Sequence, residues 1–199
     1  MSLLNYCLLS LGVCAFSGAA TAQDDSTPLA EAGVQWVYNN LETSSTGGWS
    51  NQNGASLYGQ YFFKSAGRVL HARTTLGIVA DLSGSASRSG SLYTYLFGPR
   101  VNMEWRKSHL VFHAEYKLGG DHVRVNGLTQ GGPNIFVTRN SFTGGGVGDG
   151  LDVVVSHHYV VSLFQIDFLD VDVPHFSGGG HWEADMRISA GISYRFGQR

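Results

Sequence analysis

Residues 186–196 read MRISAGISYRF, and apolar side chains alternate with polar, charged or glycine positions along the whole stretch. The apolar positions are Met186, Ile188, Ala190, Ile192, Tyr194 and Phe196. Because successive side chains of a β-strand point to opposite faces, this pattern predicts a strand with one apolar and one polar face. At about 3.3 Å per residue, about ten tilted residues cross the hydrocarbon of a bilayer, so the length fits a membrane strand.

The same stretch ends in an alternating motif with a terminal aromatic pair, Ile188-x-Ala190-x-Ile192-x-Tyr194-x-Phe196. This motif resembles the C-terminal assembly signal of bacterial outer-membrane β-barrel proteins, which usually stands at or near the last residue. Here three residues follow Phe196. The resemblance implies that the apolar face of the motif meets outer-membrane lipids and that the outer-membrane assembly machinery inserts the chain.

Length and composition favour a single β-rich domain. The chain has 199 residues, a net charge of −2, 27 glycines, 12% aromatic and 14% charged residues. A charge this small gives no basis for nucleic-acid binding. After the amino terminus no apolar stretch is long enough for a membrane helix, so a membrane protein of this composition would have to be a β-barrel.

The amino-terminal segment predicts a cleavable signal peptide covering residues 1–22. Residues 3–16 are largely apolar, and small residues follow up to Ala20-Thr21-Ala22, the A-x-A pattern of a signal-peptidase site before Gln23. Both cysteines, Cys7 and Cys14, lie in this segment, so the mature chain would contain none. The alternatives are a buried or membrane-anchoring helix and a lipidated Cys14.

Seven further segments alternate, which predicts eight strands after a polar periplasmic lead-in at residues 23–32. The segments are 34–40, 55–63, 69–81, 92–103, 109–118, 142–155 and 159–173. Pro99 lacks a ladder donor and predicts a bulge in its strand. Asp149 falls on the apolar face of its strand, which implies either a bulge that turns it inward or a wrong register there.

The links between these segments alternate between short and long. Short links are expected at residues 64–67, 105–108 and 156–158, and long polar links at 43–53, 83–91, 119–140 and 170–185. Tight periplasmic turns and long extracellular loops are typical of outer-membrane barrels. The chain therefore resembles the small OmpA/OmpX/Opa-like family, which implies that residues 33–199 form an all-β, eight-stranded, antiparallel up-and-down transmembrane β-barrel.

With the apolar faces toward lipid, eight charged residues are expected to face the lumen. They are Arg73, Arg100, Glu115, Lys117, Asp152, Asp167, Arg187 and Arg195. The interior of an eight-stranded barrel is just wide enough for side chains to fill, and buried charges must pair. The sequence thus predicts a salt-bridged plug, with a narrow solute or ion pathway as the alternative.

Two groups of residues raise the question of a metal site. His109 and His113 are four residues apart, but the local period is two and no third ligand accompanies them. One expected loop carries acids and histidines at Asp170, Asp172, His175 and His181. Ordinary lumen or interface positions explain the two histidines, and solvation explains the loop residues, so no metal site is predicted.

Two other motifs raise the question of a cofactor or an enzyme. The glycine run 144–150 does not match the spacing of a nucleotide-binding loop, so no cofactor is predicted. Ser156, His157 and His158 share a short turn, but a hydrolase needs a base oriented toward its nucleophile. No catalytic residues are predicted, and a lipid-modifying barrel enzyme remains an alternative.

The predicted function is therefore a non-enzymatic outer-membrane barrel with a structural role in the envelope or a role in surface contacts. The candidate contact residues lie in the expected loop 119–140 and are Asp121, His122, Arg124, Ile135 and Phe136. The main alternative is a soluble lipocalin-like barrel with Ile188 inside and Arg187 outside. Ile188→Arg is expected to cost about 2–4 kcal/mol, and Ser189→Arg less, if the membrane assignment holds.

Overall fold

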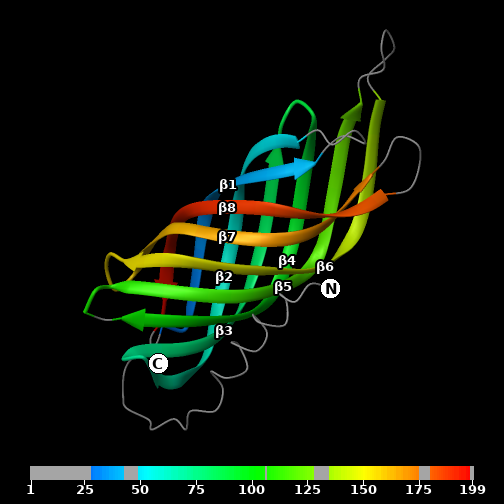
Figure 1. Cartoon of the computed structure of the whole chain (residues 1–199). Helices are drawn as coiled ribbons and strands as arrows, with labels where there is room; N and C mark the ends of the chain where they lie inside the picture. Colours follow the sequence, from blue (N-terminus) through cyan, green and yellow to red (C-terminus); the bar gives the residue numbers. More distant parts are fainter. Residues whose placement is uncertain (1–27, 43–48, 106, 128–134, 175–179, 198–199) are drawn as a thin grey trace.

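The computed structural model describes residues 28–42, 49–105, 107–127, 135–174 and 180–197, so the predicted signal peptide lies outside the described residues. Eight antiparallel strands each pair with the next, and β8 pairs back with β1 to close a barrel (Figure 1). They are β1 (Ala30–Glu42), β2 (Trp49–Val69), β3 (Ala72–Ala86), β4 (Gly90–Trp105), β5 (Leu110–Gly127), β6 (Ile135–Val154), β7 (Tyr159–Pro174) and β8 (Gly180–Phe196). The predicted fold class is confirmed. No helix among the described residues is long and apolar enough to cross a membrane.

The barrel starts earlier than residue 33, because β1 begins at Ala30, opposite Phe196 in the closing ladder. The first short turn is also displaced. It lies at Leu70 and His71, both with positive φ, and not at residues 64–67. Two register shifts between Phe62 and Gly67 let β2 continue, and such irregularities hide the period of two in the sequence.

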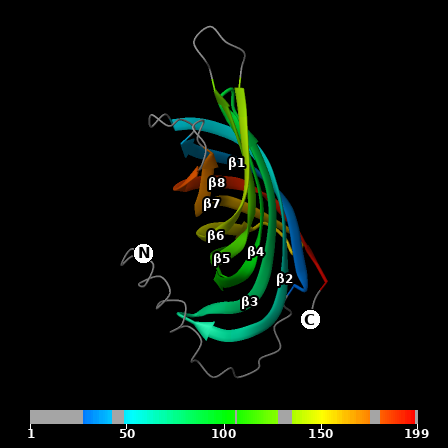
Figure 2. The same cartoon turned by 90° about the vertical axis from the view of Figure 1, so that its right-hand side faces the viewer.

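The predicted long loops are largely strand. At this end β1 stops at Glu42, β5 at Gly127 and β7 at Pro174, and β2, β6 and β8 begin at Trp49, Ile135 and Gly180, so the expected loop at 119–140 was wrong over most of its length. The β5–β6 ladder continues from Gly119 opposite Thr143 to Gly127 opposite Ile135. Figures 1 and 2 show this hairpin projecting beyond the other strands. Backbone ladder bonds form whatever the side chains are, so polar composition alone does not mark a loop.

The facing of β8 is the one predicted for a membrane strand. Arg187 is 1% exposed and Arg195 is buried, whereas Ile192 is 48% exposed on the outer face. The soluble lipocalin-like alternative required the reverse and is wrong. Exposed apolar side chains also cover the outer faces of the other strands, including Val34, Trp36, Leu57, Ile78, Leu82, Tyr95, Phe97, Tyr116, Phe164 and Phe168.

Two irregularities expected from the sequence do not occur. The β4–β5 register is the same on both sides of Pro99, which faces outward in an unshifted strand, so the predicted bulge at Pro99 was wrong. A register shift does fall within the glycine-rich stretch, between Gly119 opposite Thr143 and Lys117 opposite Gly146. It does not turn Asp149 inward, because Asp149 is exposed on the outer face.

Candidate functional site: the layered lumen and the projecting hairpin

The inward side chains of the barrel form two layers, a charged layer toward the short turns and an apolar layer toward the projecting hairpin. The charged layer centres on Arg187 of β8, which is 1% exposed. Its guanidinium donates to Asp167 on β7 from Nε, at 2.9 Å, and from Nη2, at 2.7 Å. Nη2 also donates to Asp81 on β3. Arg187 therefore bridges two strands on opposite sides of the lumen.

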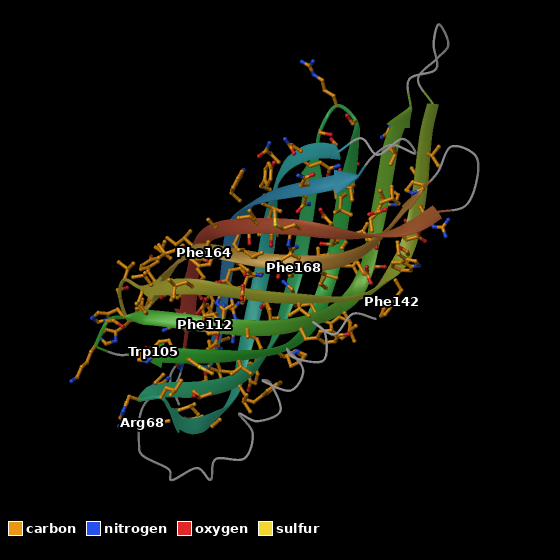
Figure 3. The ribbon with its side chains drawn as sticks, viewed as in Figure 1. Arg68, Trp105, Phe112, Phe142, Phe164 and Phe168 are labelled. Carbon is orange, nitrogen blue, oxygen red and sulfur yellow. The ribbon has the colours of Figure 1, made fainter. Side chains whose placement is uncertain are left out.

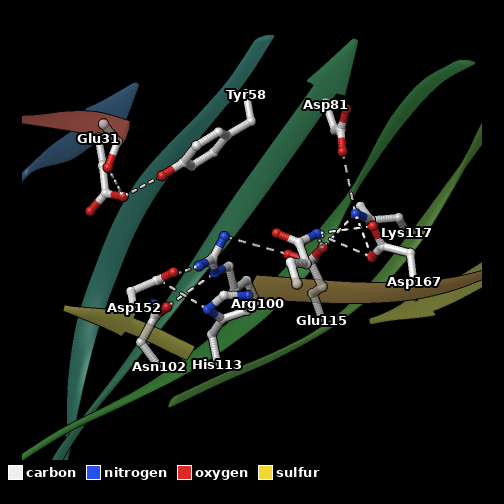
Figure 4. Close-up of polar contacts among 12 residues, drawn as sticks. Glu31, Tyr58, Asp81, Arg100, Asn102, His113, Glu115, Lys117, Asp152 and Asp167 are labelled. Atoms are coloured by element: carbon white, nitrogen blue, oxygen red, sulfur yellow. Dashed lines mark hydrogen bonds and ion pairs between the residues drawn. The ribbon is translucent and has the colours of Figure 1, made fainter. Parts of the chain in front are cut away.

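Lys117 extends the same network (Figure 4). Its ammonium lies 2.9 Å from Asp167 Oδ1 and 3.4 Å from Asp81 Oδ2, and it also pairs with Glu115. Glu115 Oε2 in turn lies 3.6 Å from Nη1 of Arg100. These groups are fully or almost fully buried, so each charge depends on its partners to offset the cost of desolvation.

Arg100 links the network to β6. Its Nη2 donates to Asp152 Oδ2 at 3.1 Å, and His113 Nδ1 lies 3.0 Å from the same carboxylate oxygen. His113 is therefore a lumen residue, while His109 is exposed beside a short turn, so the two histidines do not form a pair. Four carboxylates, three permanent cations and one imidazole make up this chain of contacts.

Two neutral side chains connect the network to the remaining strands. Gln165 donates to Glu115 at 2.7 Å and accepts from Gln35 of β1 at 3.4 Å. Ser56 of β2 donates to Asp81 at 2.9 Å. Contacts of the charged layer thus reach all eight strands, which fixes the strands relative to one another across the lumen.

The glycine run of β6 makes room for this layer. Gly146, Gly148 and Gly150 face inward, on the side of the strand opposite Asp149. A Cβ built on Gly148 would lie 2.1 Å from Asp167 Oδ1, and one on Gly150 would lie 2.5 Å from His113 Nε2. Any larger residue would displace the charged side chains. The glycine run is therefore a packing surface for the lumen charges.

A second buried cluster closes the seam between β1 and β8. Arg195 Nε donates to Glu31 Oε2 at 2.9 Å, and Tyr58 and Ser193 each donate to Glu31 Oε1 at 2.6 Å. Arg73, the remaining predicted lumen residue, is buried on β3 close to the first short turn. The cluster ties the first strand to the last at the short-turn end.

An apolar cluster, here called the apolar layer, lies in the lumen on the other side of the charges. Eight buried side chains from β1, β4, β5 and β7 pack together: Leu41, Leu92, Leu96, Val123, Val125, Leu169, Val171 and Val173. They continue the inward-facing positions of their strands. A packed apolar core in series with an ion-pair network leaves the lumen occupied by side chains at both levels.

The predicted contact residues lie on the projecting hairpin. Asp121, His122 and Arg124 belong to β5, with Asp121 buried and Arg124 exposed, while Ile135 and Phe136 begin β6. Ser141 donates to both oxygens of Asp121, at 2.7 and 2.8 Å. Burial, with a smaller contribution from nearby Asp172, raises the pKa of Asp121 to about 6.

The residues considered for other chemistry are not arranged for it. Ser156 Oγ accepts from the backbone N–H groups of His158 and Tyr159, whereas the His158 ring stacks on Tyr194. Asp170 is exposed and Asp172 is buried beside Arg139. His175 lies outside the described residues, and among those described no three His, Cys, Asp or Glu side chains gather to hold a metal ion.

Several lumen residues were missed from the sequence. Asp81 was not listed with the lumen charges, and Glu31 was assigned to the lead-in. Both could have been found from the alternation of side chains along a strand. Asp81 continues the inward positions of Arg73 and Thr75, and Glu31 continues that of Gln35. The apolar layer was missed because an apolar inner face cannot be told from a lipid face by periodicity alone.

The outer surface shows which medium surrounds the barrel. Large apolar side chains are exposed on all eight strands, and an aromatic group including Tyr159, Tyr194 and Phe196 lies near the short turns. Exposing these apolar side chains to water is unfavourable, whereas lipid tails are as apolar as they are. A closed barrel also leaves no unpaired strand edge in the hydrocarbon. These features place the chain in the outer membrane.

Comparisons with known proteins agree with this architecture. No model of a known protein family and no curated protein matches the sequence. The solved structure of Neisserial surface protein A is 14% identical and has a TM-score of 0.55 over 87% of this chain and 100% of that one. Ail, the attachment invasion locus protein of Yersinia pestis, solved with the heparin analogue sucrose octasulfate, is 14% identical with a TM-score of 0.50 over 84% and 99%. The chain thus has the fold of the small eight-stranded outer-membrane β-barrels, as its terminal strand predicted.

Proposed function

We propose that this protein is a non-conducting, non-enzymatic outer-membrane barrel that holds a rigid β-hairpin outside the membrane for surface contacts. The observation that carries the proposal is the filled lumen beneath an extended ladder. The charged and apolar layers occupy the interior, and nine residue pairs of β5 and β6 continue the sheet beyond the charged layer, with Val123 and Val125 of this stretch packed in the apolar layer. Such an arrangement favours a barrel that anchors the β5–β6 hairpin and presents its surface over a barrel that forms a pathway for solutes or ions.

The charge of the outer part bears on what this surface contacts. Its described residues with exposed or half-exposed charges include two carboxylates, at Asp170 and Glu183, and three arginines, at Arg88, Arg124 and Arg139, whereas Asp121, Asp172 and Asp185 are buried. Because these surface charges nearly balance, charge alone does not select between a polyanion, such as the sulfated sugar bound in the Ail structure, and a neutral surface.

The proposal is tested by shortening the hairpin at a point where the ladder itself offers a closure. Gly119 lies opposite Thr143, so a two-residue Asn-Gly turn can join them after deletion of residues 120–142. Cells that display the full-length barrel, and cells that display the shortened barrel, are applied to immobilised extracellular-matrix proteins, glycans and purified lipopolysaccharide. We expect the shortened barrel to insert and shift its gel mobility on boiling, but to lose the contacts that the full chain makes.

The closed lumen is tested separately by planar-bilayer recording of the refolded protein, with a general porin as the positive control. We expect no stepwise conductance from the wild type. Regular conductance steps would contradict the non-conducting assignment. Unchanged adhesion after removal of the hairpin would contradict the surface role.

A further inference from the structure

Asp149 is a carboxylate on the lipid side of the barrel wall. It is exposed on β6, opposite Ala114 of β5 and Ile166 of β7. It lies five residues from Val154, the end of β6. At about 3.3 Å per residue and a tilt near 40°, this is roughly 13 Å from the short-turn end, near the middle of an apolar band about 25 Å tall.

The outward direction of Asp149 is enforced by its neighbours. Gly148 and Gly150 both face inward, because a side chain at either would collide with Asp167 or His113. Side chains alternate along a strand, so the residue between these glycines must face outward. The strand cannot bring Asp149 inside without disrupting the charged layer.

The surroundings of Asp149 are apolar. On the described outer faces of β5 from Leu110 to Leu118, β6 from Val147 to Val153 and β7 from Val161 to Phe168, it is the one charged side chain. Figure 3 shows the labelled Phe112, Phe164 and Phe168 on the strands to either side. A carboxyl group in hydrocarbon needs a hydrogen-bond partner, since lipid tails provide none.

We propose that the outer face of β6 around Asp149 is a contact surface for a second copy of this chain. Two barrels inserted by the same route have the same orientation, so a twofold axis between them runs along the membrane normal. Equivalent residues then lie at equal depth, and a contact at β6 brings the two Asp149 side chains together. With both carboxyl groups protonated, the O–H of each donates to the carbonyl oxygen of the other, which gives an uncharged hydrogen-bonded pair.

The wall around Asp149 suits close approach. Ala114 carries a small side chain at the same level, and Val147, Leu151 and Ile166 provide apolar contact around it. Small residues at such contacts let backbones approach, and polar groups between them add hydrogen bonds in the membrane. The described outer residues of β1 from Ala30 to Tyr38, β2 from Ala55 to Phe63, β3 from Thr74 to Leu82, β4 from Tyr93 to Met103 and β8 from Ala184 to Phe196 include no Lys, Arg or His, so another wall of a second copy offers Asp149 no cation there.

Cysteine cross-linking in isolated outer membranes tests the contact. The chain has two cysteines, so Cys7 and Cys14 are first changed to Ser. Asp149→Cys is compared with Leu57→Cys, whose side chain is 60% exposed on β2, four strands away around the barrel. After mild oxidation we expect a disulfide-linked dimer of Asp149→Cys at least about tenfold above that of Leu57→Cys. Equal yields, or adducts of Asp149→Cys with a different protein, would overturn the proposal.

Sedimentation of the refolded protein in detergent gives a second measurement that needs no cysteine. We expect a dimer for the wild type and for Asp149→Asn, whose amide both donates and accepts. We expect the dissociation constant of Asp149→Leu to rise about three- to tenfold. Gel mobility before and after boiling confirms that each variant is folded. A monomeric wild type, or an Asp149→Leu dimer as tight as the wild type, would contradict the carboxyl contact.

Discussion

Gly148 illustrates how a single missing side chain shapes this barrel. Its absent Cβ leaves the space that Asp167 Oδ1 occupies, and Cγ of Glu115 lies 3.3 Å from the same point. Asp167 is the carboxylate that pairs with both Arg187 and Lys117. The glycine therefore sets the position of the central ion pairs.

Gly148→Ala is expected to destabilise the folded barrel by about 1–3 kcal/mol, because the added methyl group displaces a paired carboxylate. The matched control is Gly59→Ala on β2, where the nearest atom to the new Cβ is the Glu31 carbonyl oxygen at 3.9 Å. Urea unfolding in detergent measures both. Equal losses in the two variants would mean that the crowding at Gly148 does not matter.

Asp121 gives the projecting hairpin a dependence on pH. The folded state raises the pKa of this carboxyl to about 6, so folding favours its protonated form. Its contribution to stability is therefore greatest at low pH and falls as pH rises from about 4 through 6. We expect Asp121→Asn to be more stable than the wild type at pH 7 and equal to it near pH 4. Hydrogen exchange of the β5 amides at pH 4 and pH 7 measures the stability of the hairpin in both proteins. The same difference between the wild type and Asp121→Asn at the two pH values would contradict the prediction.

At the scale of the element, β8 depends on the depth at which each outward side chain meets lipid. Ile188→Arg places a charge in the lipid-facing band of β8 and is expected to cost about 2–4 kcal/mol and impair assembly. Ser189→Arg is no longer the suitable control, because Ser189 is 1% exposed in a filled lumen and Arg would overpack it. Ala184→Arg, on the same outer face but beyond the membrane band, is expected to be mild. Yields of heat-modifiable protein compare the two, and equal losses would contradict the facing of β8.

The strands β3, β5 and β7 are held together through Lys117, whose ammonium meets Asp81, Glu115 and Asp167. Lys117→Met leaves these buried carboxylates short of one cation and is expected to cost about 3–5 kcal/mol. Adding Glu115→Gln removes one uncompensated charge and should restore part of the loss. Urea unfolding of the single and double variants measures the coupling. If the losses in the free energy of unfolding of the two single variants add in the double variant, Lys117 and Glu115 do not act as a pair.

At the scale of the whole molecule, the two lumen layers contribute differently. Leu169 is 1% exposed within the apolar layer, and Leu169→Ala is expected to destabilise the barrel by about 2–5 kcal/mol. Leu163→Ala, outward on the same strand and 49% exposed, should cost clearly less. Neither variant should conduct in planar bilayers, because the charged layer still occupies the lumen. Conductance from Leu169→Ala would show that the apolar layer alone closes the barrel.

The alternation of side chains was sufficient to predict the strand number and the facing of the lumen charges, whereas the closed antiparallel topology was implied by the resemblance to small outer-membrane barrels. Period two is a local property of an extended backbone, so β8 and the inward face of Gly146, Gly148 and Gly150 could be read directly. Predictions failed where strands left the membrane or changed register. The first short turn and the long loops were misplaced, because ladder bonds and bulges do not depend on polarity.

The sequence by itself determined that this chain forms alternating strands and which face of most of them meets lipid, since both follow from spacing between near neighbours. Only the tertiary structure decided which charges pair, because partners such as Asp81 and Arg187 are 106 residues apart and meet only when the barrel closes. It also decided that an apolar core lies in series with those charges, and that Asp149 stays in the lipid face. Contacts across a closed lumen depend on strand register and closure, which no local pattern specifies.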